Sequence, residues 1–238
     1  MPEVVSHGRP PNVYACAVCH LPTGAGHPDS GNLSGMNADY LARQMADFKT
    51  EVRKGFRSNS MRIIAKAITD DEINVAGAYF AGIKPTPWTK VVETTTVPKS
   101  YVGTDSMRFP VPNGGKEPIG HRIIELPVDD EGAENRDPHT GFVAYVPPGS
   151  VKRGEALVKT GGNGKTTACA ICHGPDLQGL GDVPKIAGHS AIYVVRQLND
   201  IAIGDRKGPG AALMMPVVAK LSVDDMIDLA AYVASRQP

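Results

Sequence analysis

Cys16-Ala17-Val18-Cys19-His20 returns later in the chain as Cys169-Ala170-Ile171-Cys172-His173, so the pattern C-x-x-C-H occurs twice among 238 residues. The two copies are 153 residues apart, and together they contain all four cysteines of the sequence. Each copy places two sulfur atoms and one imidazole on a single short segment. The chain therefore repeats one chemical arrangement at two distant points.

The offset of 153 residues also aligns residues outside the two motifs, without a gap. It superposes Leu33-Ser34-Gly35 on Ile186-Ala187-Gly188, Tyr40 on Tyr193, Gln44 on Gln197, Asp47 on Asp200, Met61 on Met214, Asp71 on Asp224 and Tyr79 on Tyr232. Stacked repeat arrays need three or more copies. Two copies, each with its own motif, indicate instead a tandem duplication that gives two like domains.

The C-x-x-C-H pattern is typical of covalent haem attachment. Its two cysteines form thioethers with one porphyrin, and the adjacent histidine binds the iron. We therefore predict two covalently bound haem c groups. The first is held by Cys16, Cys19 and His20, and the second by Cys169, Cys172 and His173. A domain of about 85 residues buries a thin core by itself, and only 5% of the residues are aromatic. A haem in each domain would supply apolar mass.

A methionine thioether is the sixth iron ligand that suits reversible electron transfer. Met61 lies 41 residues after His20, and Met214 lies 41 residues after His173. The repeat therefore favours Met214 over its neighbour Met215, which we expect to point elsewhere. We place Met61 in a loop before the next helix. The alternative role for both methionines is ordinary core packing.

These residues could also form two other kinds of metal site. The two C-x-x-C pairs could meet in a four-cysteine zinc site, but such a site would leave the repeated Met, Tyr and Gln residues unexplained. A second histidine could replace methionine on an iron, and the candidates are His7, His27, His121, His139 and His189. We rank histidine ligation below methionine ligation. Tyr40 and Tyr193 could hydrogen-bond haem propionates or simply pack.

Composition excludes several classes of function. Lys and Arg together number 25, as do Asp and Glu, so the formal net charge of zero gives no field that would attract nucleic acid. No run of about 18 apolar residues occurs, which argues against a membrane span. Because haem is attached to C-x-x-C-H outside the bacterial cytoplasm, we expect a periplasmic protein whose natural precursor carries an export signal that this chain lacks.

The fold expected is mainly α. Apolar residues recur at helical spacing from Ala38 to Lys54, and a capping box at Thr69 opens a helix that ends near Gly82. Ser222 opens the matching helix, and a short helix is expected from Arg153 to Val158. We expect only a truncated counterpart from Glu3 to His7.

Three parts are predicted: an N-terminal haem domain (1–82), a Pro-rich intervening segment (83–149) and a C-terminal haem domain (150–238). The intervening segment contains short strand-like runs, which are Val91 to Val97, His121 to Leu126 and Phe142 to Val146. Its apolar content argues that it packs over one or both domains as extended strands and turns, not as a flexible linker.

Residues 1–82 and 150–238 resemble class I cytochrome c domains, and the pair is similar to the two-domain dihaem cytochromes of the c4 type. The resemblance rests on both C-x-x-C-H motifs, on Leu21-Pro22 and Gly174-Pro175 after them, and on the segments Ala187 to Leu198 and Met214 to Tyr232. It implies a helical fold in each domain, His/Met ligation and periplasmic electron transfer. The long intervening segment departs from the simple members of this family.

We therefore expect an electron carrier, not an enzyme, because iron saturated by His and Met has no open position for a substrate. Its partners would be redox proteins, with a dehydrogenase as donor and an oxidase or another cytochrome as acceptor. Two alternatives stay open, namely a cytochrome subunit of a quinoprotein dehydrogenase complex and a dihaem enzyme of the peroxidase or thiosulfate dehydrogenase type. The oligomeric state is not predicted.

Overall fold

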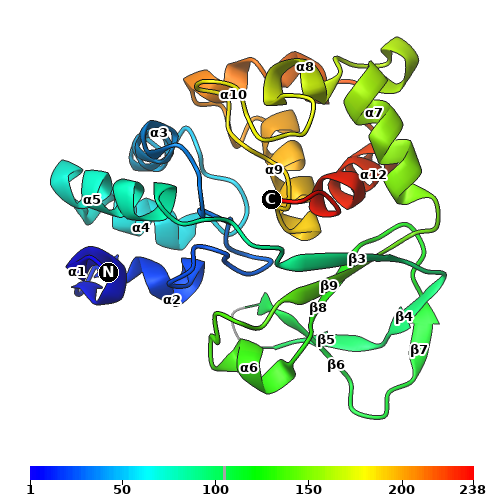
Figure 1. Cartoon of the computed structure of the whole chain (residues 1–238), viewed down its shortest axis with the longest axis horizontal. Coiled ribbons are helices and arrows are strands. Elements are labelled where there is room, and N and C mark those ends of the chain that lie inside the picture. Colours follow the sequence, from blue (N-terminus) through cyan, green and yellow to red (C-terminus); the bar gives the residue numbers. More distant parts are fainter. Residues whose placement is uncertain (104–105) are drawn as a thin grey trace.

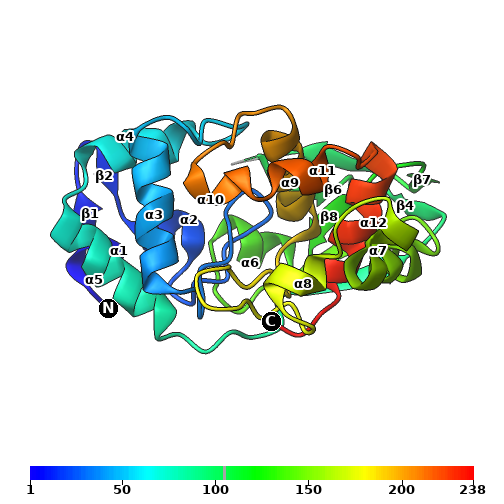
Figure 2. The same cartoon turned by 90° about the horizontal axis from the view of Figure 1, so that it is seen from above.

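A computed structural model describes residues 1–103 and 106–238. Figure 1 shows the helices of residues 1–82 beside those of residues 150–238, with the strands of residues 83–149 against the latter. We call these parts the N-terminal repeat, the C-terminal repeat and the intervening segment. Figure 2, seen from above, shows the same separation of the two groups of helices. No helix among the described residues is long and apolar enough to cross a bilayer.

The N-terminal repeat is helical apart from a two-residue ladder near its start, as the sequence predicts. Its elements are α1 (Glu3–Ser6), β1 (Gly8–Arg9), β2 (Val13–Tyr14), α2 (Cys16–His20), α3 (Ala38–Lys49), α4 (Asn59–Ala67) and α5 (Asp70–Ala81). Helix α1 has only four residues, in line with the truncation expected there. Helix α3 ends at Lys49, five residues before the predicted end, because residues 52–54 turn away to pair with the other repeat.

The C-terminal repeat follows the same order. Its elements are α7 (Ser150–Gly164), α8 (Cys169–His173), α9 (Ala191–Ala202), α10 (Pro209–Ala212), α11 (Met215–Val218) and α12 (Val223–Ala234). Helix α7 is much longer than the predicted Arg153–Val158, and its last turn bends at Gly161, Gly162 and Asn163, which adopt left-handed backbone angles. At Gly154 a Cβ atom would lie 2.0 Å from the Asp228 carbonyl oxygen, so glycine is what allows α7 to cross α12 closely.

The capping box predicted at Thr69 is present, and Ser222, which was expected to open the matching helix, forms a second one. The Thr69 side chain accepts from the Glu72 N–H at 3.2 Å, and the Glu72 carboxylate accepts from the Thr69 N–H at 2.8 Å. Ser222 and Asp225 make the same reciprocal bonds at the start of α12. Each pair satisfies two backbone donors that would otherwise lack a partner at a helix N-terminus.

Each repeat has its own core. In the N-terminal repeat it consists of Val4, Val5, Val13, Ile68, Ala76 and Phe80. In the C-terminal repeat it consists of Leu157, Val158, Leu177, Ala187, Leu229, Tyr232 and Val233. In both repeats this core joins the first and last helices with the segment around C-x-x-C-H, so it positions the motif.

The intervening segment forms short sheets and one helical turn. Its elements are β3 (Thr89–Glu93), β4 (Thr96–Pro98), β5 (Ser100–Val102), β6 (Arg108–Pro110), β7 (Lys116–Pro118), β8 (Ile124–Pro127), α6 (Asp130–Glu134) and β9 (Phe142–Val146). Strand β9 lies at the centre of a mixed sheet, parallel to β3 and antiparallel to β8, while β4–β7 and β5–β6 form antiparallel pairs. The bounds of β9 equal the predicted run.

Small residues bring the sheet close to the C-terminal repeat. Ala144 of β9 is fully buried against Ala191 of α9 and against Ala230 and Ala234 of α12. The buried Glu125 of β8 accepts hydrogen bonds from the Ser190 hydroxyl at 2.7 Å and the Ile192 N–H at 3.2 Å. A carboxylate here complements the partial positive charge at the start of α9.

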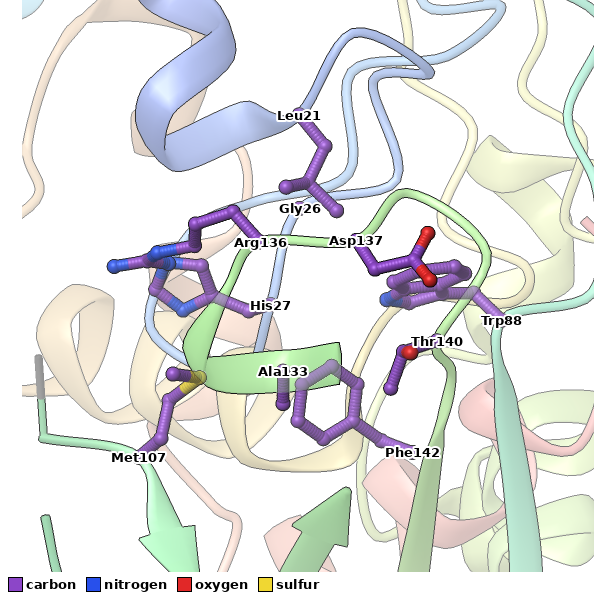
Figure 3. Close-up of a pocket in the computed structure, with 10 residues that line it drawn as sticks. All are labelled: Leu21, Gly26, His27, Trp88, Met107, Ala133, Arg136, Asp137, Thr140 and Phe142. Atoms are coloured by element: carbon purple, nitrogen blue, oxygen red, sulfur yellow. The ribbon is translucent and has the colours of Figure 1, made fainter. Parts of the chain in front are cut away.

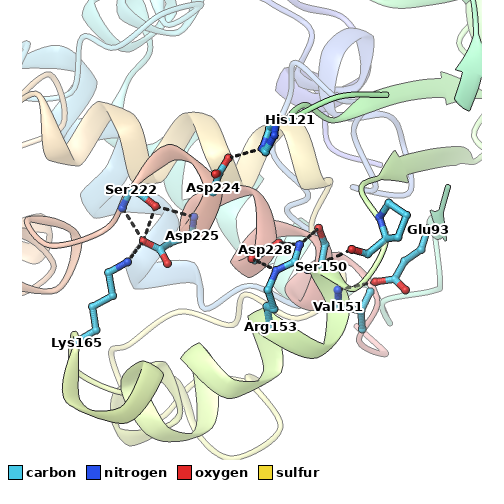
Figure 4. A network of polar contacts seen from close by, with 11 residues as sticks. Glu93, His121, Ser150, Val151, Arg153, Lys165, Ser222, Asp224, Asp225 and Asp228 are labelled. Carbon is cyan, nitrogen blue, oxygen red and sulfur yellow. Dashed lines mark hydrogen bonds and ion pairs between the residues drawn. The ribbon is translucent and has the colours of Figure 1, made fainter. Parts of the chain in front are cut away.

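Polar contacts extend this attachment along α7 and α12, as Figure 4 shows. The Glu93 carboxylate of β3 accepts from the Val151 N–H at 2.8 Å, and His121 contacts Asp224 at 3.2 Å. Within the repeat, the Arg153 guanidinium donates to both oxygens of Asp228 at 2.7 and 2.9 Å. The intervening segment therefore contacts the first turn of both α7 and α12.

The intervening segment also contacts the N-terminal repeat. Leu21 and His27 line a shallow pocket together with Trp88, Met107 and Phe142, which Figure 3 shows from close by. Leu21 and His27 are 3% and 6% exposed, whereas the repeat-related Leu180, which corresponds to His27, is 53% exposed. The segment thus contacts both repeats but covers this loop in only one of them.

Candidate functional site

The two C-x-x-C-H motifs form two separate short helices, α2 and α8. Burial raises the pKa of the Cys16 and Cys169 thiols to about 11. Among the described residues, no three His, Cys, Asp or Glu side chains are grouped as a metal site of their own. The structure therefore does not bring the two cysteine pairs together, as the zinc alternative requires.

The histidine of each motif is oriented in the same way. The Nδ1 atom of His20 lies 2.9 Å from the Gly31 carbonyl oxygen, and Nδ1 of His173 lies 2.8 Å from that of Pro184. A carbonyl oxygen only accepts, so each Nδ1 carries the proton and each Nε2 is left with a lone pair. Burial lowers the pKa of both imidazoles, which favours this neutral form. A neutral imidazole fixed in this manner fits an iron ligand.

The two methionines singled out in the sequence occupy different local structures. Met61 lies in the first turn of α4 and not in a loop, which corrects the prediction, and Met214 is the residue before α11. Both are half-buried. Met214 packs against the cluster of Ile201, Ala211 and Val218, whereas Met215 is 46% exposed. The local burial thus agrees with the preference for Met214 over Met215.

The five other histidines lie in varied surroundings. His7, His121 and His139 are exposed, and each contacts a carboxylate on the surface. His27 is buried beside Ser30, whose hydroxyl lies 3.2 Å from its Nε2 atom. His189 is 5% exposed and lies edge-on to the Tyr193 ring, with its Nδ1 atom buried and without a hydrogen-bond partner.

The backbones of the two repeats meet at an antiparallel bridge between Arg53 and Arg206. The Lys54 N–H donates to the Asp205 carbonyl oxygen and the Lys207 N–H to that of Val52, both at 2.8 Å. Arg53 and Arg206 are themselves related by the offset of 153 residues. The contact between the repeats is therefore nearly symmetric, with the same segment supplied from both sides.

The two arginine side chains cross this contact. Arg53 donates to Gln44 of its own repeat at 2.9 Å, and to Tyr193 and Gln197 of the other at 3.0 and 2.8 Å. Arg206 mirrors this pattern. It donates to Gln197 at 3.0 Å, and to Tyr40 and Gln44 at 2.9 Å each. Each guanidinium thus joins the repeated Tyr and Gln residues of both halves into one network.

A second pair of symmetric contacts flanks the network. Arg196 binds Asp29, with 2.8 Å to its carbonyl and 3.1 Å to its carboxylate, and Arg43 binds Asp182 at 3.1 and 3.6 Å. These four residues are also related by the offset of 153. Sequence reasoning missed all the arginine pairs, although the offset that aligned the tyrosines and glutamines would have found them.

The side chains around this contact fit a cofactor that carries carboxylates. The hydrogen-bond acceptors of Arg53 and Arg206 are neutral Tyr and Gln oxygens, although the cations are packed between the repeats. The Arg206 Nε atom is buried without a partner, as is the His189 Nδ1 atom. Buried cations call for anions nearby, and the carboxylates of Asp47 and Asp200 supply part of this charge, since both interact electrostatically with Arg53. The propionates of a haem would supply further anions.

Comparisons with known proteins identify relatives of this chain. The Cytochrome c family model matches residues 151–237. Cytochrome c-554(548) of Halomonas halodenitrificans is 42% identical over 77 residues, which are 32% of this chain and 93% of that protein. The thiosulfate dehydrogenase electron acceptor of Stutzerimonas stutzeri is 28% identical over 232 residues, which are 96% of this chain and 82% of that protein.

Two solved structures share the arrangement of the whole chain. A thiosulfate dehydrogenase (TsdBA) from Marichromatium purpuratum aligns with a TM-score of 0.66 and 25% identity over 98% of this chain, which spans 39% of that longer protein. Cytochrome c4 of Acidithiobacillus ferrooxidans aligns with a TM-score of 0.62 and 24% identity over 92% of this chain and 98% of its own. The similarity to this cytochrome c4 is a similarity of fold, and the fold is that of a two-domain cytochrome.

Proposed function

The chain belongs to the cytochrome c family and is a dihaem electron-transfer cytochrome of the c4 type, and from that premise we propose that it carries electrons in the periplasm from a dehydrogenase to a downstream acceptor. The single observation that supports this most is the matched orientation of His20 and His173. A dihaem electron carrier needs both irons to be permanently ligated, and both repeats hold their imidazole in the same way.

The residues proposed to hold the two haem groups follow the repeat. Cys16 and Cys19 would attach the first, with His20 and Met61 as its axial ligands. In the second repeat these roles fall to Cys169, Cys172, His173 and Met214. The bound irons supply one-electron redox chemistry. The parts of the chain would be two haem domains (1–82 and 150–238) joined by the intervening segment (83–149).

The protein's own contribution is to orient ligands and to hold the two sites together. The carbonyls of Gly31 and Pro184 fix the tautomer and the ring orientation of the two histidines, which is how a neighbouring shell tunes a metal ligand. The crossed guanidiniums of Arg53 and Arg206 would hold carboxylates of the cofactors beside the contact between the repeats. No substrate is transformed in this scheme.

The proposed donor is a thiosulfate dehydrogenase. A relative of which this chain covers 82% is a thiosulfate dehydrogenase electron acceptor, and the longer solved chain that this chain resembles is a thiosulfate dehydrogenase. Mixing the oxidised protein with a purified thiosulfate dehydrogenase and thiosulfate tests the donor. Haem reduction that requires both enzyme and thiosulfate supports it, and no reduction above the thiosulfate-only control counts against it.

The carrier role itself is tested by an optical redox titration that follows the methionine–iron band near ~695 nm together with haem content. We expect two haems per chain, both with this band and with positive potentials. A haem that lacks the band and is high-spin would instead support the alternative of a dihaem enzyme.

A further inference from the structure

The loop that orients His20 lies against the C-terminal repeat. The Gly31 carbonyl oxygen, which lies 2.9 Å from the Nδ1 atom of His20, belongs to residues 29–34, which we call the first loop. The corresponding residues 182–187, which we call the second loop, carry the Pro184 carbonyl that orients the other histidine. A ligating histidine is oriented by the group that accepts from its second ring nitrogen. Whatever holds the first loop therefore also holds His20.

Two cations of the C-terminal repeat bind the ends of the first loop. At its start, the Arg196 guanidinium donates to the Asp29 carbonyl oxygen at 2.8 Å and to the Asp29 carboxylate at 3.1 Å. At its end, the Lys185 ammonium donates to the Ser34 carbonyl oxygen at 2.9 Å. Lys185 and Ser34 are both buried. Hydrogen bonds of charged donors are stronger than neutral ones, so both ends of the first loop are well anchored.

The Tyr193 ring packs on the middle of the first loop. A Cβ atom at Gly31 would lie only 3.0 Å from the Tyr193 Cζ atom and from its hydroxyl oxygen. Glycine is therefore what allows the ring to approach the residue whose carbonyl binds His20. Glycine also has more conformational freedom than any other residue. The order of the first loop at this point therefore depends on the Tyr193 side chain that covers it.

The second loop has more support from its own repeat. Pro184 stands at the position of Gly31, and its ring restricts the backbone angle φ. The Leu177 carbonyl oxygen accepts from the N–H groups of both Ile186 and Ala187, at 2.9 and 3.1 Å. The second loop is thus fixed by a proline and by two backbone hydrogen bonds.

The first loop lacks this proline and uses its side chains differently. Asn32 stands at the position of Lys185, and its Oδ1 atom accepts from the Ser34 N–H at 2.9 Å and from the Ser34 hydroxyl at 2.6 Å. From the other side, Arg43 binds Asp182 of the second loop, but both of these side chains are exposed. The support that one repeat gives to the histidine-orienting loop of the other is therefore unequal.

We propose that Lys185, Tyr193 and Arg196 are positioning residues for His20, so that the C-terminal repeat sets the strength of the hydrogen bond between His20 and Gly31. A firm bond at Nδ1 makes an imidazole a stronger electron donor to iron and favours the oxidised state. The reduction potential of the first haem then depends on the contact between the repeats, whereas that of the second does so much less. This inference rests on the proposed role of His20 as an iron ligand.

The test follows the exchange of the Nδ1 proton for deuterium in the reduced holoprotein, by nuclear magnetic resonance with isotope-labelled histidine. His20 and His173 are compared within one molecule. Arg196→Met and Lys185→Met each remove one anchor of the first loop, and Arg43→Met is the matched control. Because exchange requires local opening, we expect the first two changes to speed exchange at His20 about tenfold and to leave His173 within about twofold.

The control should behave differently, since Arg43→Met removes an exposed contact of the second loop. We expect this change to leave exchange at both histidines within about twofold. Unchanged exchange at His20 in Arg196→Met and Lys185→Met would overturn the positioning role. Equal acceleration at His20 and His173 would overturn it as well, because that result reports a general loss of stability.

The reduction potential of the first haem separates positioning from simple loss of charge. A weaker bond to Gly31 makes the imidazole a poorer donor and raises this potential. Loss of a nearby cation alone lowers it, since positive charge favours the reduced iron. We expect a higher potential in Arg196→Met than in Arg43→Met, which removes the same charge. A lower potential in Arg196→Met would contradict the role of Arg196 in holding the first loop.

The outcome is distinguishable from that of the proposed function. Haem content and the methionine–iron band are measured for the wild type and for every variant. If the wild type has two six-coordinate haems while the variants leave His20 unaffected, the carrier role stands and the positioning role fails. If the wild type has fewer, the carrier role fails, while selective acceleration at His20 still supports the positioning role.

Discussion

The two symmetric arginine–aspartate pairs between the repeats provide a prediction with its own control. Arg196→Met removes a guanidinium that, with Asp29, is largely enclosed, since the two side chains are 12% and 19% exposed. Arg43→Met removes the repeat-related guanidinium, but the side chains of Arg43 and Asp182 are 46% and 83% exposed. The two variants remove the same kind of ion pair but differ in burial, and Arg196 also lies 5.4 Å from the centroid of the Tyr193 ring.

The expected losses follow from that burial. Arg196→Met removes two enclosed hydrogen bonds from the guanidinium to Asp29, and hydrogen bonds of charged groups are worth more than neutral ones, so this change should cost about 3 kcal/mol of unfolding free energy. Water screens the exposed pair, so Arg43→Met should cost about 0–1 kcal/mol. Methionine keeps most of the aliphatic volume in both variants.

The measurement is urea unfolding of the holoprotein, followed by far-ultraviolet circular dichroism. For a slope of about 2 kcal/mol per molar urea, a difference of about 2 kcal/mol moves the transition midpoint by roughly 1 M. We expect the midpoint of Arg196→Met to lie below that of Arg43→Met by about this amount. Equal midpoints, or a larger loss in Arg43→Met, would refute the reasoning from burial.

Three further predictions concern other parts of the molecule. Met214→Ala should leave the second haem attached but make its iron high-spin, and an optical spectrum identical to that of the wild type would rule out Met214 as a ligand. Burial raises the pKa of Glu125 above its ordinary 4.5, so the folded state binds this proton more tightly. The contribution of protonated Glu125 to the stability of the fold is therefore complete below pH 4.5, and it falls as the pH rises towards the pKa of Glu125 in the folded state. The Glu125→Gln variant has no such proton. In urea titrations at stepped pH, the stability of the wild type relative to this variant should therefore decline over that range. A difference in stability that stays constant with pH would contradict the predicted direction. Thr69→Ala and Ser222→Ala each remove a capping side chain and should each lower the unfolding free energy by about 1 kcal/mol, whereas a Thr69→Ser control should retain most of it.

Local signals in the sequence predicted the elements that depend on nearby residues. The capping box at Thr69, the helix start at Ser222 and the bounds of β9 were confirmed, because a cap or an alternating strand is encoded within a few positions. The end of α3 was predicted wrongly. Its apolar spacing continues to Val52, but the backbone there pairs with residues 205–207 instead of extending the helix.

Contacts between the repeats could not be predicted from periodicity. Arg53 and Tyr193 are 140 residues apart, and their hydrogen bond exists only because two copies of one fold face each other. The motif residues, in contrast, can be predicted from the sequence alone, because the spacing of C-x-x-C-H encodes its chemistry within five positions. The ligand assignments for Met61 and Met214 remain predictions that rest on the repeat.

Because both repeats belong to one chain, the contact between them has a smaller free-energy cost to overcome than a contact between two separate molecules. Two separate molecules that associate lose translational and rotational freedom, at a cost of about 4–15 kcal/mol. Here the ordered strands of the intervening segment pack on both halves and hold them at a high effective concentration. A few crossed hydrogen bonds at Arg53 and Arg206 can therefore fix the relative orientation of the two sites without a large apolar interface between them, and the surface that such an interface would occupy stays available for partners.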